Sequence, residues 1–125
     1  MTLQGWLGDT VNLFVAYPKG SVISSFTGLT QAILAVGPFL IAHVVNAVIV
    51  LILGILVVML TFKWTKSRGA RVASVLGLLA IISAFVGGVM FVLSGFQNNE
   101  SSAQMGGSFI GAYALYFTVL YYTKD

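Results

Sequence analysis

A histidine and a nearby asparagine are the residues of this sequence most suited to chemistry in an apolar environment. His43 is the only histidine among 125 residues, and Asn46 follows three positions later, which places both side chains on one face of a helix. Three interpretations stay open: His43 ligates haem b, it forms a proton or quinone site, or a neutral imidazole hydrogen-bonds a neighbouring helix. The second haem ligand is then Met90, Met105 or the same histidine of a second copy.

The rest of the chain supplies little for catalysis. Asp9, Glu100 and Asp125 are the only carboxylates, and none lies in an apolar segment, so no pair can share general acid–base work there. The absence of cysteine excludes disulfides, thiolate metal sites and cysteine nucleophiles. The serines have no nearby base to activate them. We therefore expect a non-enzymatic protein without a metal site.

Composition predicts that these residues lie in a membrane. Hydrophobic residues make up 58% of the chain and charged residues only 7%, against about 25% charged in soluble domains. We expect one all-α integral membrane domain over residues 1–125. The net charge of +3 does not indicate sequence-specific nucleic-acid binding, because four of the positive residues fall in one short segment: Lys63, Lys66, Arg68 and Arg71.

Two helices are expected before that basic segment, with a third ahead of them. Residues 1–16 have the spacing of a short amphipathic helix, expected to pack against the others, and a turn is expected at Tyr17–Ser21. No charge occurs from Val22 to Phe62, a length of about 60 Å if helical and twice the hydrocarbon thickness. Gly37-Pro38 divides it into helices at 26–36 and 38–62, or kinks one long helix.

The second half of the chain predicts two further spans. A basic loop at 63–71 precedes a span at 72–96, and a polar loop at 97–105 precedes a third span at 106–123. Four positive charges in a short loop place it in the cytoplasm when the chain lies in a cell membrane.

Small residues recur at helical spacing in both of these spans. They predict close helix contact, either within one molecule or between subunits: Gly77, Ala80, Ala84, Gly88, Gly107 and Gly111.

The segment Ala47–Phe96 resembles the conjugative pilins of type IV secretion systems, which have two Gly/Ala/Val-rich helices joined by a short basic loop. The matching helices are Ala47–Phe62 and Val72–Phe96, with Lys63–Arg71 between them. The resemblance implies subunits that rest in the membrane and then form an extracellular tube with bound phospholipid, whose lumen is lined by the basic loop, here Lys63, Lys66, Arg68 and Arg71. The third hydrophobic segment, the amphipathic first helix and the lack of a long leader depart from that family.

The leading hypothesis is a structural subunit that self-assembles through its hydrophobic helices, most concretely a conjugative-pilin-like subunit of a DNA-transfer pilus. Its partners are then other copies, membrane lipid and secretion-machinery proteins, and it needs no cofactor beyond bound lipid. The alternative is a small haem b-binding or accessory subunit of a respiratory or other membrane complex that uses His43. A transporter or channel is the third hypothesis.

Overall fold

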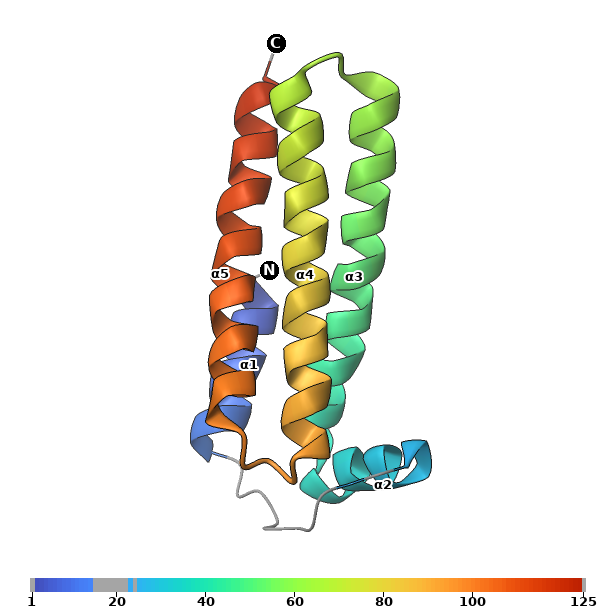
Figure 1. Cartoon of the computed structure of the whole chain (residues 1–125), viewed down its shortest axis with the longest axis vertical. Coiled ribbons are helices and arrows are strands. Elements are labelled where there is room, and N and C mark those ends of the chain that lie inside the picture. Colours follow the sequence, from blue (N-terminus) through green and yellow to red (C-terminus); the bar gives the residue numbers. More distant parts are fainter. Residues whose placement is uncertain (1, 15–22, 24, 125) are drawn as a thin grey trace.

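The computed structural model describes residues 2–14, 23 and 25–124, and this part of the chain forms five helices without a strand (Figure 1). The all-α prediction is therefore confirmed for the described residues. The helices are α1 (Thr2–Phe14), α2 (Phe26–Val36), α3 (Pro38–Trp64), α4 (Arg68–Leu93) and α5 (Asn99–Tyr122). The turn expected at Tyr17–Ser21 lies outside the described residues.

The three long helices lie side by side and alternate in direction (Figure 1). Helix α4 stands in the centre, with α5 on one side and α3 on the other. Helix α1 packs beside α3 in the half of the bundle away from the α3–α4 connection, and α2 lies across that end of the bundle. The carboxyl end of the chain lies at the opposite end, next to the α3–α4 connection.

A sharp joint separates α2 from α3, so the division at Gly37-Pro38 is confirmed and the single kinked helix is not formed. Gly37 has φ of 110° and ψ of −174°, a backbone conformation that residues with a side chain rarely adopt. Pro38 is the first residue of α3, where its missing N–H breaks no helical hydrogen bond. This joint lets α2 turn away from the axis of α3 and cover the end of the bundle.

The α3–α4 connection is shorter than the expected loop, because only residues 65–67 are outside the helices. The Ser67 side chain caps α4 by accepting a hydrogen bond from the Ala70 N–H. Arg71 closes the turn: its Nε donates to the Thr65 carbonyl at 3.0 Å and its Nη2 to the Phe62 carbonyl at 3.3 Å. Its guanidinium also stacks over the Phe62 ring at 5.2 Å.

Helix α5 begins earlier than the expected span. The Asn98 side chain caps it by accepting from the Ser101 N–H, and residues 99–105, expected in a polar loop, form its first turns. Gly95 and Phe96 bend the chain between α4 and α5, with φ of 67° and 64°. The expected spans 72–96 and 106–123 are thus longer helices with different ends.

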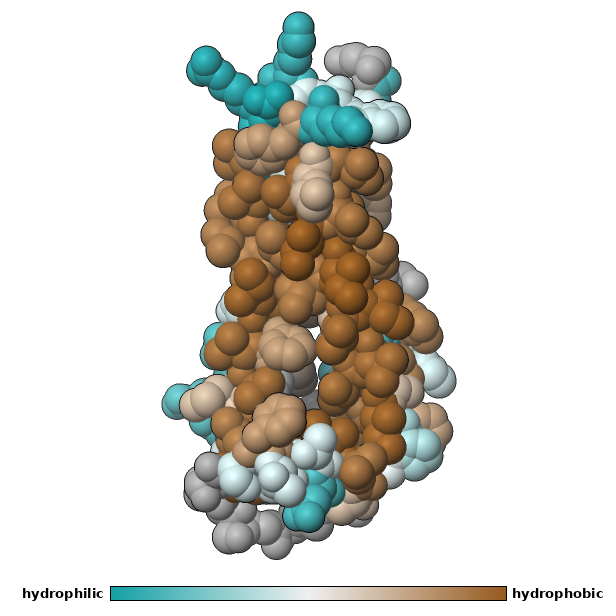
Figure 2. Space-filling model, turned by 90° about the vertical axis from the view of Figure 1, so that its right-hand side faces the viewer, coloured by the Kyte–Doolittle hydropathy of each residue, from teal (hydrophilic) through white to brown (hydrophobic). Residues whose placement is uncertain are grey.

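Two of the described helices, α3 and α4, are long and apolar enough to cross a membrane. Figure 2 shows one face of the molecule, the right-hand side of Figure 1, as a broad hydrophobic band with hydrophilic residues at both ends. Helix α3 carries much of this band, since it buries only Leu40, Gly54 and Thr61. Helix α5, expected as a third span, is not among the helices that are apolar enough to cross a membrane.

Small residues bring α4 close to α5. A Cβ added at Gly87 would lie 3.0 Å from the Ser101 carbonyl oxygen and 3.2 Å from the Met105 nitrogen. At Gly77 it would lie 3.1 Å from the Tyr116 ring. The spacing of small residues predicts a packing role for Gly77 but does not single out Gly87.

The other expected packing residues divide into two groups. Ala80 is half-buried, and Gly88 and Ala84 lie where α4 faces a cavity. Gly107 and Gly111 have no atom within 4 Å of an added Cβ. These two glycines of α5 therefore face open space in the single chain.

Candidate ligand cavity

A cavity of about 450 Å³ lies between the helices in the half of the bundle that α1 and α2 cover. Every helix contributes to its wall. Leu29 and Ile33 come from α2, Leu40 and Val44 from α3, and Phe109 from α5. The wall is mostly apolar, with Gln4, Thr30, His43 and Ser102 as its polar side chains. None of the described residues that line it is charged.

Glycines of α1 let that helix form one side of the cavity. A Cβ added at Gly8 would lie 3.2 Å from His43 Cε1, and one at Gly5 would lie 3.3 Å from Phe109 Cε1. Both positions are tighter than ordinary van der Waals contact. Without side chains here, α1 reaches the imidazole of α3 and the phenyl ring of α5 at once.

Helix α1 exposes part of its apolar face, although Leu7 is buried. Leu3 and Trp6 are exposed by 56% and 60%, whereas the polar Gln4 faces the bundle. In an apolar surrounding this arrangement is favourable, because the polar side chain needs a partner inside and the apolar ones do not.

Gln4 connects the two residues that the sequence singled out. Asn46 Nδ2 donates a hydrogen bond to Gln4 Oε1 at 2.6 Å, and Gln4 Nε2 lies 3.3 Å from His43 Nε2. His43 and Asn46 are therefore connected, but through Gln4 of α1, which lies 39 positions before His43 in the sequence. His43 thus has a hydrogen-bond partner on a neighbouring helix, but this partner is the Gln4 amide and not the carbonyl or hydroxyl group of that interpretation.

The second ring nitrogen of His43 has a different environment. Nδ1 is buried and has no hydrogen-bond partner among the described residues. Most buried polar atoms in proteins have a partner, so an unpartnered one marks a functional or strained position.

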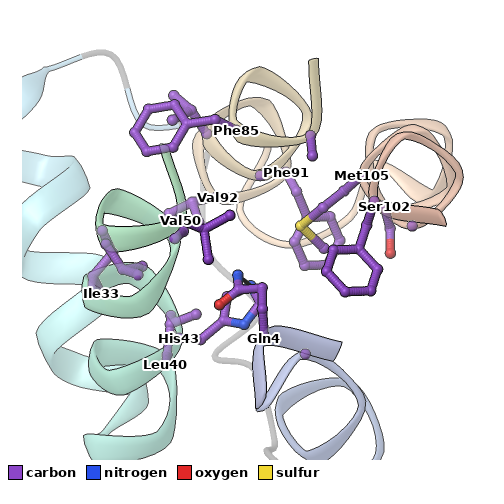
Figure 3. Close-up of a pocket in the computed structure, with 18 of the residues that line it drawn as sticks. Gln4, Ile33, Leu40, His43, Val50, Phe85, Phe91, Val92, Ser102 and Met105 are labelled. Atoms are coloured by element: carbon purple, nitrogen blue, oxygen red, sulfur yellow. Dashed lines mark hydrogen bonds between the residues drawn. The ribbon is translucent and has the colours of Figure 1, made fainter. Parts of the chain in front are cut away.

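Aromatic rings and a thioether form the opposite part of the wall. Figure 3 shows Gln4 and His43 side by side, with Phe91 of α4 and Met105 of α5 across the space. Phe91 meets Phe96 edge to face, with 5.7 Å between ring centres. Phe26, Phe85 and Phe109 also line the cavity. Such a wall favours a flat apolar molecule.

Only one of the two methionines considered as haem ligands lies beside the cavity. Met105 lines the cavity together with His43, whereas Met90 does not line it and is 50% exposed. The described residues contain no cluster of three or more His, Asp or Glu side chains that could hold a metal ion.

The basic residues lie at the other end of the bundle. Lys63, Lys66 and Arg68 are exposed around the α3–α4 connection, while Arg71 makes the internal contacts described above. The cavity and the basic end are therefore separate regions of the molecule.

Comparison of the chain with protein-family models, with curated proteins and with solved structures found no match.

Proposed function

We propose that this chain is a non-enzymatic membrane protein that binds a small, neutral, lipid-soluble molecule between its helices. The observation that carries the proposal is the cavity of about 450 Å³, whose mostly apolar wall includes a few polar side chains, among them the hydrogen-bonded pair Gln4 and His43. Ligand sites generally have this character, with apolar walls and a few placed polar groups. A charged ligand would lack a counter-ion among the described lining residues.

Two adjacent glycines of α5 give a matched test of this proposal. Gly106 lines the cavity and Gly107 does not, yet an added Cβ at either has no atom within 4 Å. The full chain and the variants Gly106→Leu and Gly107→Leu are purified from native membranes in mild detergent. Co-purifying neutral molecules are then extracted and measured by mass spectrometry.

We expect the bound molecule to fall about tenfold in Gly106→Leu, the effect of losing about 1.4 kcal/mol of binding free energy, and to stay unchanged in Gly107→Leu. Ala84→Leu, which fills the cavity from α4, gives a second reading of the same effect. Equal amounts in all four proteins, each shown to be helical by circular dichroism, would contradict the proposal.

Haem b is a second candidate occupant, because His43 and Met105 line the same cavity. Haem carries two propionates, and the described lining residues supply no Lys or Arg to pair with them. The wall therefore favours a neutral ligand over haem. An absorption spectrum of the purified protein decides the matter: a Soret band that is lost in His43→Phe would replace the neutral ligand by haem.

We further propose that copies of the chain assemble through the exposed apolar face of α3. This is the property that the resemblance to conjugative pilins implies. The chain has no cysteine, so single cysteines report contacts between copies without background. Ile52 of α3 and Ile110 of α5 are exposed by 52% and 69%. We expect Ile52→Cys to form disulfide-linked dimers in native membranes and Ile110→Cys to form none. Monomeric Ile52→Cys under oxidation would reject assembly through α3.

A further inference from the structure

A glutamine amide on the outside of the α4–α5 pair is only half satisfied in the single chain. Gln104 of α5 donates from Nε2 to Ser83 Oγ at 3.2 Å and to the Ser83 carbonyl at 3.5 Å. The Gln104 side chain is exposed, and no described residue bonds to its Oε1. Turning the amide over would place its oxygen against the Ser83 carbonyl oxygen, where two acceptors meet. In either orientation one end of the amide is left without a partner.

The same amide lies far from both ends of α4. Along this helix, Ser83 is about 18 Å from Arg71 and about 15 Å from Leu93, whereas the hydrocarbon of a bilayer is about 30 Å thick. In the proposed membrane form, Gln104 therefore lies among lipid chains, which offer neither a donor nor an acceptor. An unpaired amide is unfavourable there, so this position requires a polar partner that belongs to a protein.

That partner does not come from the cavity, because Gln104 lies on another side of α5. Ser102, Gly106 and Phe109 of α5 line the cavity, whereas Gln104 and Gly111 do not. Gly111 follows Gln104 by seven residues, or about two helical turns, and so lies on the same face. An added Cβ at Gly111 has no atom within 4 Å. The surface beside the amide is therefore open to the approach of another helix.

We propose that two copies of the chain associate through this face of α5, with the Gln104 amide of each copy hydrogen-bonded to that of the other. Ser83 takes one hydrogen of Nε2, so the second hydrogen and Oε1 form a donor and an acceptor that complement themselves in a reciprocal pair. Hydrogen bonds of this kind associate helices in membranes.

The basic α3–α4 connection supports a second copy as the partner. In the proposed membrane form it gives every copy the same orientation, so identical residues lie at equal depth. Two copies related by a two-fold axis along the membrane normal then bring Gln104 to Gln104. This inference rests on the proposed membrane location, and it adds an interface distinct from the one proposed for α3.

Neighbouring positions of α5 give a matched test of the contact. The chain has no cysteine, so Gly111→Cys and Ile110→Cys each introduce a single thiol, and the two point about 100° apart around the helix. The full chain is studied in native membranes in a glutathione buffer, where disulfide exchange keeps monomer and dimer at equilibrium. We expect Gly111→Cys to form disulfide-linked dimers and Ile110→Cys to form none.

Two changes in the Gly111→Cys chain separate the amide pair from the internal packing of α4 and α5. Gln104→Met keeps an unbranched side chain of similar length without the amide, whereas Ser83→Ala removes the internal partner and keeps the amide. We expect Gln104→Met to lower the dimerisation constant about tenfold, as loss of two hydrogen bonds between membrane helices does. Ser83→Ala should dimerise at least as well as its parent.

Three outcomes would overturn the inference, and they are distinguishable from failure of the proposed function. An equal loss in Gln104→Met and Ser83→Ala would trace the dimer to the fold of the single chain. Unchanged dimerisation in Gln104→Met would exclude the amide pair. Monomeric Gly111→Cys beside dimeric Ile52→Cys would reject this interface and leave assembly through α3 standing. Release of the unmodified chain from membranes by alkaline carbonate would instead reject the membrane location itself.

Discussion

Helix α4 meets its two neighbours in different ways. Against α5 it is closely packed, with backbone facing backbone at Gly87 and the Tyr116 ring against Gly77. Against α3 the contact is narrower, and toward the α2 end the helices separate around the cavity. Gly87, which faces the backbone of α5, closes the first interface, whereas Ala84 and Gly88 line the cavity.

The two interfaces of α4 therefore have different roles: one stabilises the fold, and the other leaves space for a ligand. In a membrane, helices gain from close backbone approach because lipid is as apolar as their side chains. The α4–α5 interface uses that gain to stabilise the fold. The interface between α3 and α4 is less closely packed and gains less from backbone contact, but it leaves a space that a ligand can occupy.

The largest effect is expected at the closest point of the α4–α5 interface. Gly87→Ala places a Cβ 3.0 Å from the Ser101 carbonyl oxygen, a backbone atom that cannot rotate away. We expect the free energy of unfolding to fall by about 2 kcal/mol, measured by unfolding in mixed micelles. Gly107→Ala, with open space around it, is the control and should not be destabilised. A Gly87→Ala protein as stable as wild type would show that α4 and α5 are not closely packed.

Tyr116 tests the junction of all three long helices. Its hydroxyl is buried without a partner in the described residues, and its ring contacts Gly77. Tyr116→Phe removes the unsatisfied group and keeps the ring, so we expect a gain of about 1 kcal/mol in unfolding free energy. Tyr121→Phe, at a side chain exposed by 72%, should have no effect. A loss of stability in Tyr116→Phe would mean that the hydroxyl has a partner in the membrane.

A polar cluster gives a smaller effect in the α4–α5 interface. Ser83 Oγ accepts hydrogen bonds from Gln104 Nε2 at 3.2 Å and from Ser108 Oγ at 3.0 Å. Ser83→Ala removes both, and hydrogen bonds between membrane helices average about 0.6 kcal/mol. We expect a loss of about that size in the same unfolding assay. If Ser83→Ala is as stable as wild type while Gly87→Ala is destabilised, then close packing alone stabilises the α4–α5 interface.

The smallest effect is expected where α3 approaches α4. A Cβ at Gly54 would lie 2.9 Å from Ile81 Cδ1 and 3.0 Å from the Tyr116 hydroxyl, both at the ends of side chains. These ends can shift, and alanine gains about 1 kcal/mol over glycine in helix propensity. Gly54→Ala should therefore change stability by less than about 0.5 kcal/mol. A loss as large as that of Gly87→Ala would remove the distinction between the two interfaces.

Helix limits were predictable where a local signal sets them. Gly37-Pro38 predicts the end of α2 and the start of α3, and both are observed. The sequence predicts a span from residue 106, after the polar segment 97–105, but a helix begins at its cap. Asn98 provides that cap, and polar residues such as Glu100 fit its first turn.

The candidate site was only half predictable. His43 and Asn46 stand out as polar residues in an apolar segment, and their spacing places them on one face. Gln4 carries no such signal, because it sits among other polar residues of an amphipathic pattern. Its role depends on how α1 docks against α3, a tertiary contact made possible by Gly5 and Gly8. Local periodicity contains no information on that docking.

Arg71 has a consequence for the bilayer in which the proposed membrane protein can reside. Its guanidinium is held against the ends of α3 and α4, so it cannot extend outward as a free lysine or arginine would. In the proposed membrane form it would therefore mark a fixed depth at the boundary of the hydrocarbon. From Arg71 to Leu93, α4 rises about 33 Å, slightly more than the hydrocarbon thickness of about 30 Å. A thinner bilayer then imposes hydrophobic mismatch, met by tilting the bundle. The contacts of Arg71 would thus suit the proposed membrane protein to bilayers whose hydrocarbon is about 30 Å thick or thicker.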